Sequence, residues 1–126
     1  MVRPFMSKTR KLEQKEFQEI LDKLEEYRRK IYEYNKLVSG KGFRIKPLHI
    51  VVKKQNNTTV KYLYFGRYWY KVVYVGRSGK TSKVKWIYLG KEKPDNTLPD
   101  PPKHPLEGIV VKIDDTGVYL ISSRQV

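Results

Sequence analysis

The sequence predicts an α+β fold, in which a long amino-terminal helix precedes a small antiparallel β-sheet or an SH3-like partial barrel. Residues 7–38 lack proline and glycine and repeat apolar residues at helical spacing. Beyond Gly42, runs of β-branched and aromatic residues are separated by turn residues, a pattern typical of strands. The 126 residues suffice for one domain. We therefore expect a helix over residues 1–42, a sheet over 43–93, a linker over 94–106 and a hairpin over 107–126 that packs on the sheet.

The expected helix begins at Ser7 or Thr9, which are good N-cap residues, and ends at Gly40 or Gly42. Its apolar residues recur at spacings of three and four, the a and d positions of a heptad repeat. They are Phe17, Ile20, Leu24, Tyr27, Ile31, Tyr34 and Val38. So narrow a seam favours dimerisation as a coiled coil, and packing of the helix on the protein's own sheet is the alternative.

The sheet is expected to contain strands over residues 48–54, 58–65, 68–75 and 83–89. Their short connections, at residues 55–57, 66–67 and 76–79, predict an antiparallel meander. Gly66-Arg67 matches a two-residue type II′ turn, because glycine takes the first position of that turn without strain. We therefore expect a tight hairpin at Gly66.

The segment that follows Gly90 contains five prolines within residues 94–105. Proline fixes φ and removes a backbone donor, so this segment is expected to be an extended linker without regular structure. Two further runs, residues 109–113 and 118–121, flank Asp114-Asp115-Thr116-Gly117 and predict a last hairpin. The pattern leaves open whether this hairpin joins the first sheet.

Charge is distributed unevenly along the chain, whose formal net charge is +14 at pH 7. Residues 7–38 hold nine bases and seven acids, whereas residues 39–94 hold fourteen bases and a single acid, Glu92. A block of like charges repels itself, and a polyanionic partner relieves that repulsion. The alternative interpretation is that the lysines keep the sheet soluble and protect its edges.

The same basic block holds eight Tyr and Trp residues between positions 62 and 88, more than one face of a small core needs. Cations neutralise phosphates and exposed rings stack on bases, so the combination indicates nucleic-acid binding. The candidate contact residues are Arg67, Lys71, Arg77, Lys80, Lys83, Lys85, Tyr68, Tyr70 and Trp86. For any single tyrosine, a place in the core is the alternative.

Residues suited to catalysis are sparse. The chain has no cysteine and two histidines, and its carboxy-terminal acids lie in expected loops and turns, where they are solvated: Asp95, Asp100, Glu107, Asp114 and Asp115. Gly79-Lys80-Thr81 matches the end of a phosphate-binding loop, but Tyr74 stands where that motif requires glycine. We therefore expect no enzyme, no metal site and no cofactor.

No stretch has the length of an apolar membrane span, and the first residues lack the apolar core of a signal peptide. A cytoplasmic location is expected from this, in the nucleoid or, for a viral protein, in the host cytoplasm. The abundance of Lys, Glu, Ile and Tyr without Cys is often seen in proteins of hyperthermophiles, and we expect a thermophilic archaeon or its virus as the source.

Two segments resemble known proteins. Residues 68–91, YWYKVVYVGRSGKTSKVKWIYLGK, resemble a short motif of small uncharacterised archaeal and bacterial proteins, in which a Tyr-Trp-Tyr strand precedes a basic turn and a Tyr-Leu-Gly ending. That resemblance implies an association with mobile elements and DNA transactions. Residues 107–120, EGIVVKIDDTGVYL, resemble the strand-turn-strand unit of SH3-like and S1-type barrels. These barrels are often nucleic-acid modules.

Together these features predict a non-enzymatic protein that binds double-stranded DNA through a basic aromatic sheet, in a chromatin-like or regulatory role. One alternative is a module that binds RNA or single-stranded nucleic acid. The other is a protein-interaction module, such as a viral inhibitor, that uses the long helix. The sequence contains no signature that selects a base sequence or a pathway.

Overall fold

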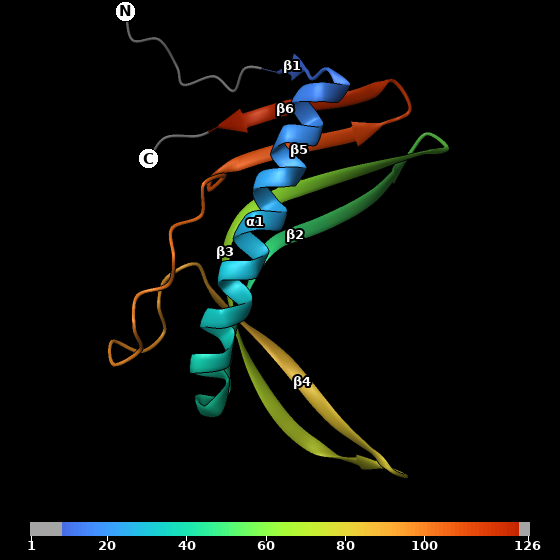
Figure 1. Ribbon diagram of the computed structural model, residues 1–126. Helices are drawn as coiled ribbons and strands as arrows, with labels where there is room; N and C mark the ends of the chain where they lie inside the picture. The colour runs from blue at the N-terminus through green and yellow to red at the C-terminus, as the bar shows by residue number, and fades with distance from the viewer. Residues whose placement is uncertain (1–8, 124–126) are drawn as a thin grey trace, which may run out of the picture.

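The computed structural model describes residues 9–123, and within them one long helix lies against an antiparallel sheet (Figure 1). The α+β prediction is therefore confirmed. The elements in chain order are β1 (Arg10–Lys11), α1 (Gln14–Val38), the 3₁₀ turn η1 (Ser39–Lys41), β2 (Phe43–Gln55), β3 (Thr58–Ser78), β4 (Thr81–Gly90), β5 (Ile109–Asp114) and β6 (Gly117–Ser123).

The sheet has the strand order β1-β6-β5-β3-β2, and β4 pairs with β3 beside this path. Every pairing is antiparallel. The carboxy-terminal hairpin thus joins the first sheet, because β5 pairs with the first half of β3. The sheet is open, with β1 and β2 at the two ends of the path, and does not close into a barrel.

The central strand β3 runs unbroken over 21 residues, so the prediction of a hairpin at Gly66-Arg67 was wrong. The reason lies on the neighbouring strand. Lys46 pairs with Tyr68 and Leu48 with Phe65, so that two residues of β3 lie opposite Pro47 alone. Proline has no N–H to donate, and a β-bulge forms at this point. The chain bends here instead of reversing.

The turns that join β2 to β3 and β3 to β4 are shorter than expected. Asn56 and Asn57 connect β2 to β3 with φ values of 49° and 68°, the positive values that a type I′ turn requires. Gly79 and Lys80 connect β3 to β4, since Ser78 pairs with Thr81. The turn expected at residues 76–79 was placed too early, because Gly76 forms a bulge within β3.

Helix α1 begins later than expected. Its first turn is closed by a capping box, in which the Glu16 carboxylate accepts a hydrogen bond from the N–H of Glu13 at 3.0 Å. Thr9 precedes β1, and Ser7 lies outside the described residues. At the other end Gly42 adopts a φ of 86° and terminates the helical segment as expected.

The heptad seam of α1 packs on the protein's own sheet, so the intramolecular alternative holds for these residues. One buried cluster joins Tyr27, Ile31, Tyr34 and Val38 to residues of β2, β3 and the proline-rich segment. Leu24 lies in a second buried cluster, against which Phe17 and Ile20 pack. Dimerisation stays a prediction, but it would have to use another surface.

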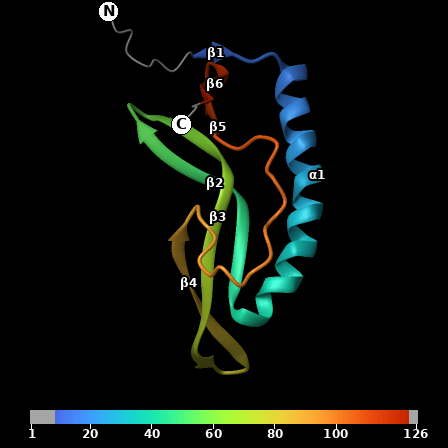
Figure 2. The same cartoon turned by 90° about the vertical axis from the view of Figure 1, so that its left-hand side faces the viewer.

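The proline-rich segment has no regular structure between Pro94 and Pro105, as expected, but it is not a solvated spacer. It runs beside α1 (Figure 2) and contributes the buried Leu98. The hydroxyl of Tyr27 donates to the Pro102 carbonyl at 2.8 Å, and that of Tyr34 donates to the Pro99 carbonyl at 2.5 Å. Helix and segment are therefore joined through both apolar packing and hydrogen bonds.

Candidate nucleic-acid interface

Beyond Lys71, β4 is the only strand among residues 9–123 that pairs with β3, because the last pair between β2 and β3 joins Phe43 to Lys71. At the base of this segment the Val72 N–H still donates to the Gly42 carbonyl at 2.7 Å. The result is a two-stranded ribbon, residues 72–86, that projects from the body of the protein and diverges from α1 (Figure 1). We call this ribbon the arm. Every residue from Thr81 to Leu89 is exposed.

The arm is basic throughout. It carries Arg77, Lys80, Lys83 and Lys85, and the sequence contains no acid between Glu33 and Glu92. Within residues 9–123, none of these four cations takes part in an ion pair. Their charges are left for an external anion.

Strand pairing distributes these cations over the arm. Lys85 pairs with Val73, so it lies on the same face as Lys83 and Lys71. Arg77 lies beyond the bulge at Gly76, next to the turn, and its guanidinium reaches the Lys80 carbonyl at 3.5 Å. A ligand that encloses the arm would meet positive charge on its faces and at its tip.

The face of the sheet that points away from α1, here called the outer face, is not covered by any other described element (Figure 2). Where the arm joins the sheet, this face carries a group of rings and cations. The rings of Tyr70 and Trp86 lie 5.7 Å apart between centroids. The Lys46 ammonium lies 4.7 Å from the Trp86 centroid and 5.0 Å from that of Tyr70, and the Arg44 guanidinium lies 5.7 Å from Trp86. These are cation–π distances.

The rings continue along the outer face as a connected series, here called the aromatic strip. Successive ring centroids are separated by 5.5 to 6.4 Å. In spatial order the series is Tyr62, Tyr64, His49, Tyr68, Tyr88, Tyr70 and Trp86. Cations lie over it at several points, including Lys53 above Tyr62 and Lys91 above Tyr68.

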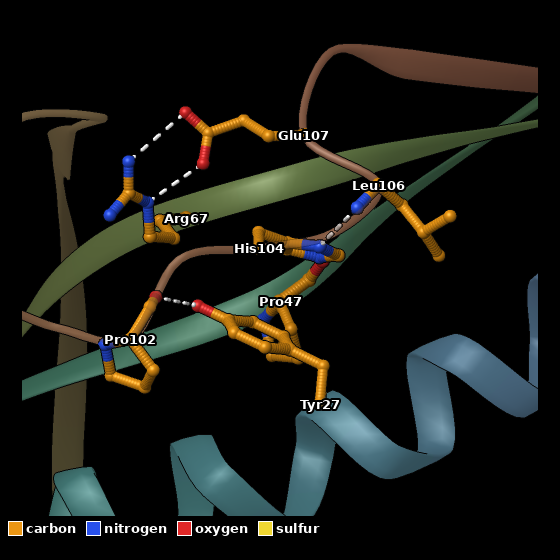
Figure 3. Close-up of polar contacts among 7 residues, drawn as sticks. All are labelled: Tyr27, Pro47, Arg67, Pro102, His104, Leu106 and Glu107. Atoms are coloured by element: carbon orange, nitrogen blue, oxygen red, sulfur yellow. Dashed lines mark hydrogen bonds and ion pairs between the residues drawn. The ribbon is translucent and has the colours of Figure 1, made fainter.

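The structure brings most of the expected contact residues together but sets two apart. Arg67 lies on the side of the proline-rich segment, where it forms a bidentate ion pair with Glu107 at 2.8 and 3.2 Å (Figure 3). Lys71 donates to the Lys41 carbonyl at 2.9 Å and lies over the Phe43 ring. Both cations stabilise the fold and have less freedom to bind a ligand.

Tyr68 belongs to the outer face but is itself 92% buried, with 8% of its surface exposed. Burial, together with the neighbouring phenols Tyr88 and Tyr64, raises its pKa to about 12. The ring therefore remains neutral at physiological pH. The Tyr68 ring therefore supports the neighbouring rings of the outer face and is too buried to stack on a ligand itself.

The candidates named from the sequence leave out several residues of this surface, although Tyr62, Tyr64 and Tyr88 belong to the aromatic group that the sequence shows: Arg44, Lys46, His49, Lys53, Tyr62, Tyr64, Tyr88 and Lys91. Arg44 and Lys46 alternate with Phe43 and Ile45, which is a strand pattern. In the structure Pro47 lies at the bulge of this edge strand, a position that proline tolerates. The expected strand begins at residue 48, whereas β2 begins at Phe43.

The acids and the buried histidine have structural partners. Hydrogen bonds from Thr97 lower the pKa of Asp95, the Lys93 ammonium lowers the pKa of Asp100, and hydrogen bonds from Thr116 lower the pKa of Asp114. Burial lowers the pKa of His104, which contacts Pro47 and Leu106 (Figure 3). Within residues 9–123, no three His, Asp or Glu side chains gather as metal ligands would.

Comparison with known proteins found no relative: no protein-family model, no curated protein and no solved structure matches the chain significantly. In the part of the chain that the structure describes, no helix has both the length and the apolar character needed to cross a membrane.

Proposed function

We propose that this protein binds double-stranded DNA by placing the arm in the major groove, with no catalytic role. The observation that carries the proposal is the arm itself, a two-stranded ribbon with exposed cations and no acid. Neighbouring strands lie about 4.8 Å apart, and the B-DNA major groove, about 12 Å wide, admits a two-stranded ribbon. Arg77, Lys80, Lys83 and Lys85 would then face phosphates on both sides of the groove.

The shape of the arm supports DNA over double-stranded RNA as the ligand. The major groove of A-form RNA is deep and too narrow for protein elements to enter. From Val72 to Ser78, β3 advances about 20 Å at roughly 3.3 Å per residue, more than the depth of about 8.5 Å of the B-DNA groove. In this arrangement Arg44 and Lys46, at the base of the arm, would contact the flanking backbone of the DNA.

The two alternative functions differ in their support. Binding of single strands is favoured by the aromatic strip, which is considered below. A protein-interaction module that uses the helix has less support, because the apolar seam of α1 is buried. Binding largely through the DNA backbone is consistent with a chromatin-like or regulatory role in the cytoplasm.

The proposal is tested by measuring the fluorescence anisotropy of a labelled DNA duplex at several salt concentrations. The test variant replaces Arg77, Lys80, Lys83 and Lys85 with Gln. If the arm contacts four phosphates, the slope of log K against log salt becomes shallower by about 3 to 4, because each phosphate contact contributes about 0.9. Affinity at low salt falls accordingly.

A matched control replaces one arginine and three lysines on the exposed surface of α1, namely Lys15, Lys23, Arg29 and Lys30, with Gln. The total charge changes equally in the two variants. The control is expected to keep the wild-type salt slope. Equal effects of the two variants would reject the arm as the binding element, as would unchanged binding by the arm variant.

A double-stranded RNA of the same sequence should bind more weakly than the DNA.

A further inference from the structure

The aromatic strip is hollowed between β2, β3 and β4. A cavity of about 240 Å³ lies there, lined by His49, Tyr68, Tyr70 and Tyr88. Its rings are tilted against one another, by 51° for His49 and Tyr68, 45° for Tyr68 and Tyr88, and 53° for Tyr70 and Tyr88. Rings that are tilted against one another leave a concave space between them. Parallel rings would stack face to face and leave no such space.

The volume of the cavity limits what it holds. Pockets that enclose a whole small molecule measure roughly 300–1,000 Å³. A cavity of about 240 Å³ is therefore suited to one ring system of a larger ligand. Because all four lining side chains are aromatic, a planar aromatic group is the best complement.

The charges around the cavity show which aromatic group is suited. The Lys46 ammonium lies 5.0 Å from the Tyr70 centroid, and the Lys91 ammonium lies 5.8 Å from the Tyr68 centroid. Lys46 belongs to β2 and Lys91 follows β4, so the two side chains approach the cavity from strands on opposite sides of β3. The carboxylate that acts on Tyr68, Glu107, is neutralised by its ion pair with Arg67. A cationic ligand would be repelled, and a planar ring with anionic groups attached would be held.

We infer that this cavity is a binding site for a single unstacked nucleobase of a nucleic-acid strand, with the adjoining phosphates on Lys46 and Lys91. The base rests against Tyr88 and His49, which are more exposed than the wall formed by Tyr68. The inference rests on the proposed function only in taking nucleic acid as the ligand. The site itself is separate from the distal arm, because none of the four arm cations lines the cavity.

The test uses a labelled single-stranded hexathymidylate and an abasic hexamer with the same number of phosphates. Stacking on one aromatic side chain changes the affinity for a single strand by roughly 5- to 100-fold. Tyr88→Ala is expected to weaken binding of hexathymidylate within that range and to leave binding of the abasic hexamer unchanged. Tyr88→Phe keeps the ring and is expected to bind within about twofold of wild type, which distinguishes stacking from hydrogen bonding by the hydroxyl.

Tyr32→Ala is the matched control, because Tyr32 is an exposed tyrosine of α1 that also lies beneath a cation, Lys36, at 4.6 Å. It is expected to bind hexathymidylate like wild type. The inference is overturned if the abasic hexamer binds wild type as tightly as hexathymidylate, if Tyr32→Ala weakens binding as much as Tyr88→Ala, or if hexathymidylate is not bound at low salt. Thermal unfolding of each variant shows whether it is folded.

The same variants separate the two proposals. If Tyr88→Ala loses hexathymidylate while the arm variant keeps its duplex affinity, the nucleobase site stands and the groove-binding proposal fails. If the arm variant loses duplex DNA while Tyr88→Ala binds hexathymidylate normally, the reverse holds.

Discussion

At the scale of single residues, His104 is held in one neutral tautomer. Its Nδ1 atom accepts a hydrogen bond from the Leu106 N–H at 3.1 Å, so Nε2 carries the proton and donates to the Pro47 carbonyl at 2.9 Å. The ring stacks on Tyr27 with 4.1 Å between centroids. Protonation would place a second N–H against the Leu106 N–H, and burial lowers the pKa of the imidazole below its usual 6.5.

This histidine should make the stability of the protein dependent on pH. Because the pKa is lower in the folded than in the unfolded state, the unfolded chain binds more protons below about pH 6.5. The free energy of unfolding is therefore expected to be constant above that pH and to fall as the pH falls from 6.5 toward the folded-state pKa. Urea unfolding between about pH 5.5 and 7.5, where carboxylates stay ionised, measures this.

His104→Gln removes the titrating group and is expected to flatten the pH dependence of the free energy of unfolding. An identical slope in His104→Gln and wild type would assign the pH dependence to other groups.

Gly66 shows how a residue's partner decides its role. In the structure, a Cβ atom at Gly66 would lie 3.2 Å from both Cζ and Oη of Tyr68, because the tyrosine ring folds over the glycine. The close approach of the Tyr68 ring to the strand backbone thus explains why glycine occupies position 66. The turn that the dipeptide Gly66-Arg67 predicts is not the reason. Tyr64 and Tyr68 on either side remain on one face, which makes the aromatic strip continuous.

At the scale of elements, α1 is attached to the edge of the sheet by a side chain. The Asn35 amide donates to the Ile45 carbonyl at 3.0 Å, and its oxygen accepts from the Ile45 N–H at 2.9 Å. Asn35 thereby pairs with β2 as another strand would, on the free side of that edge strand. The spacing of apolar residues predicts the helix but does not reveal this contact.

Asn35→Ala is expected to lower the free energy of unfolding by about 1–3 kcal/mol, because it leaves two partly buried backbone groups without a partner. Urea denaturation measures the change. Lys36→Ala, one residue further along α1 and exposed, serves as control and should change stability by less than about 0.5 kcal/mol. Equal losses in the two variants would show that the amide contact contributes nothing specific.

Because the heptad seam of α1 is buried, substitutions in this seam do not test dimerisation. Ile31 is 3% exposed and packs in the core with Trp69. A substitution such as Ile31→Asp would therefore unfold the single chain, because it buries a charge, and would not report on dimerisation. Oligomeric state is better measured on the wild-type protein by sedimentation.

At the scale of the whole molecule, charge opposes folding. The chain carries a formal net charge of +14, and the arm gathers four cations without an acid beside them. Like charges at the surface repel across a Debye length of about 30 Å at 0.01 M salt and about 3 Å at 1 M. Folding should thus be favoured by salt, in contrast to the proposed DNA binding, which salt would weaken.

We expect the midpoint of thermal unfolding to rise as sodium chloride increases from about 0.01 M to 1 M, as repulsion is screened. The variant with Gln at positions 77, 80, 83 and 85 should be more stable at low salt and less sensitive to salt. The variant with Gln at positions 15, 23, 29 and 30 should gain nothing, because α1 mixes acids with bases. A midpoint that falls with salt would contradict this account.

The sequence alone determined the features that depend on neighbours along the chain: the period of α1, the alternation of β2 to β6, the absence of regular structure among the prolines, and the basic block. Tertiary structure decided which surfaces meet. Pro47 opposite Gly66 made one long strand where the dipeptide predicts a turn, and the sheet buried a seam that was suited to a second helix. The aromatic strip followed from these pairings, since its rings come from three strands. Local propensity acts over a few residues, whereas the choice of partner depends on contacts between residues far apart in the chain.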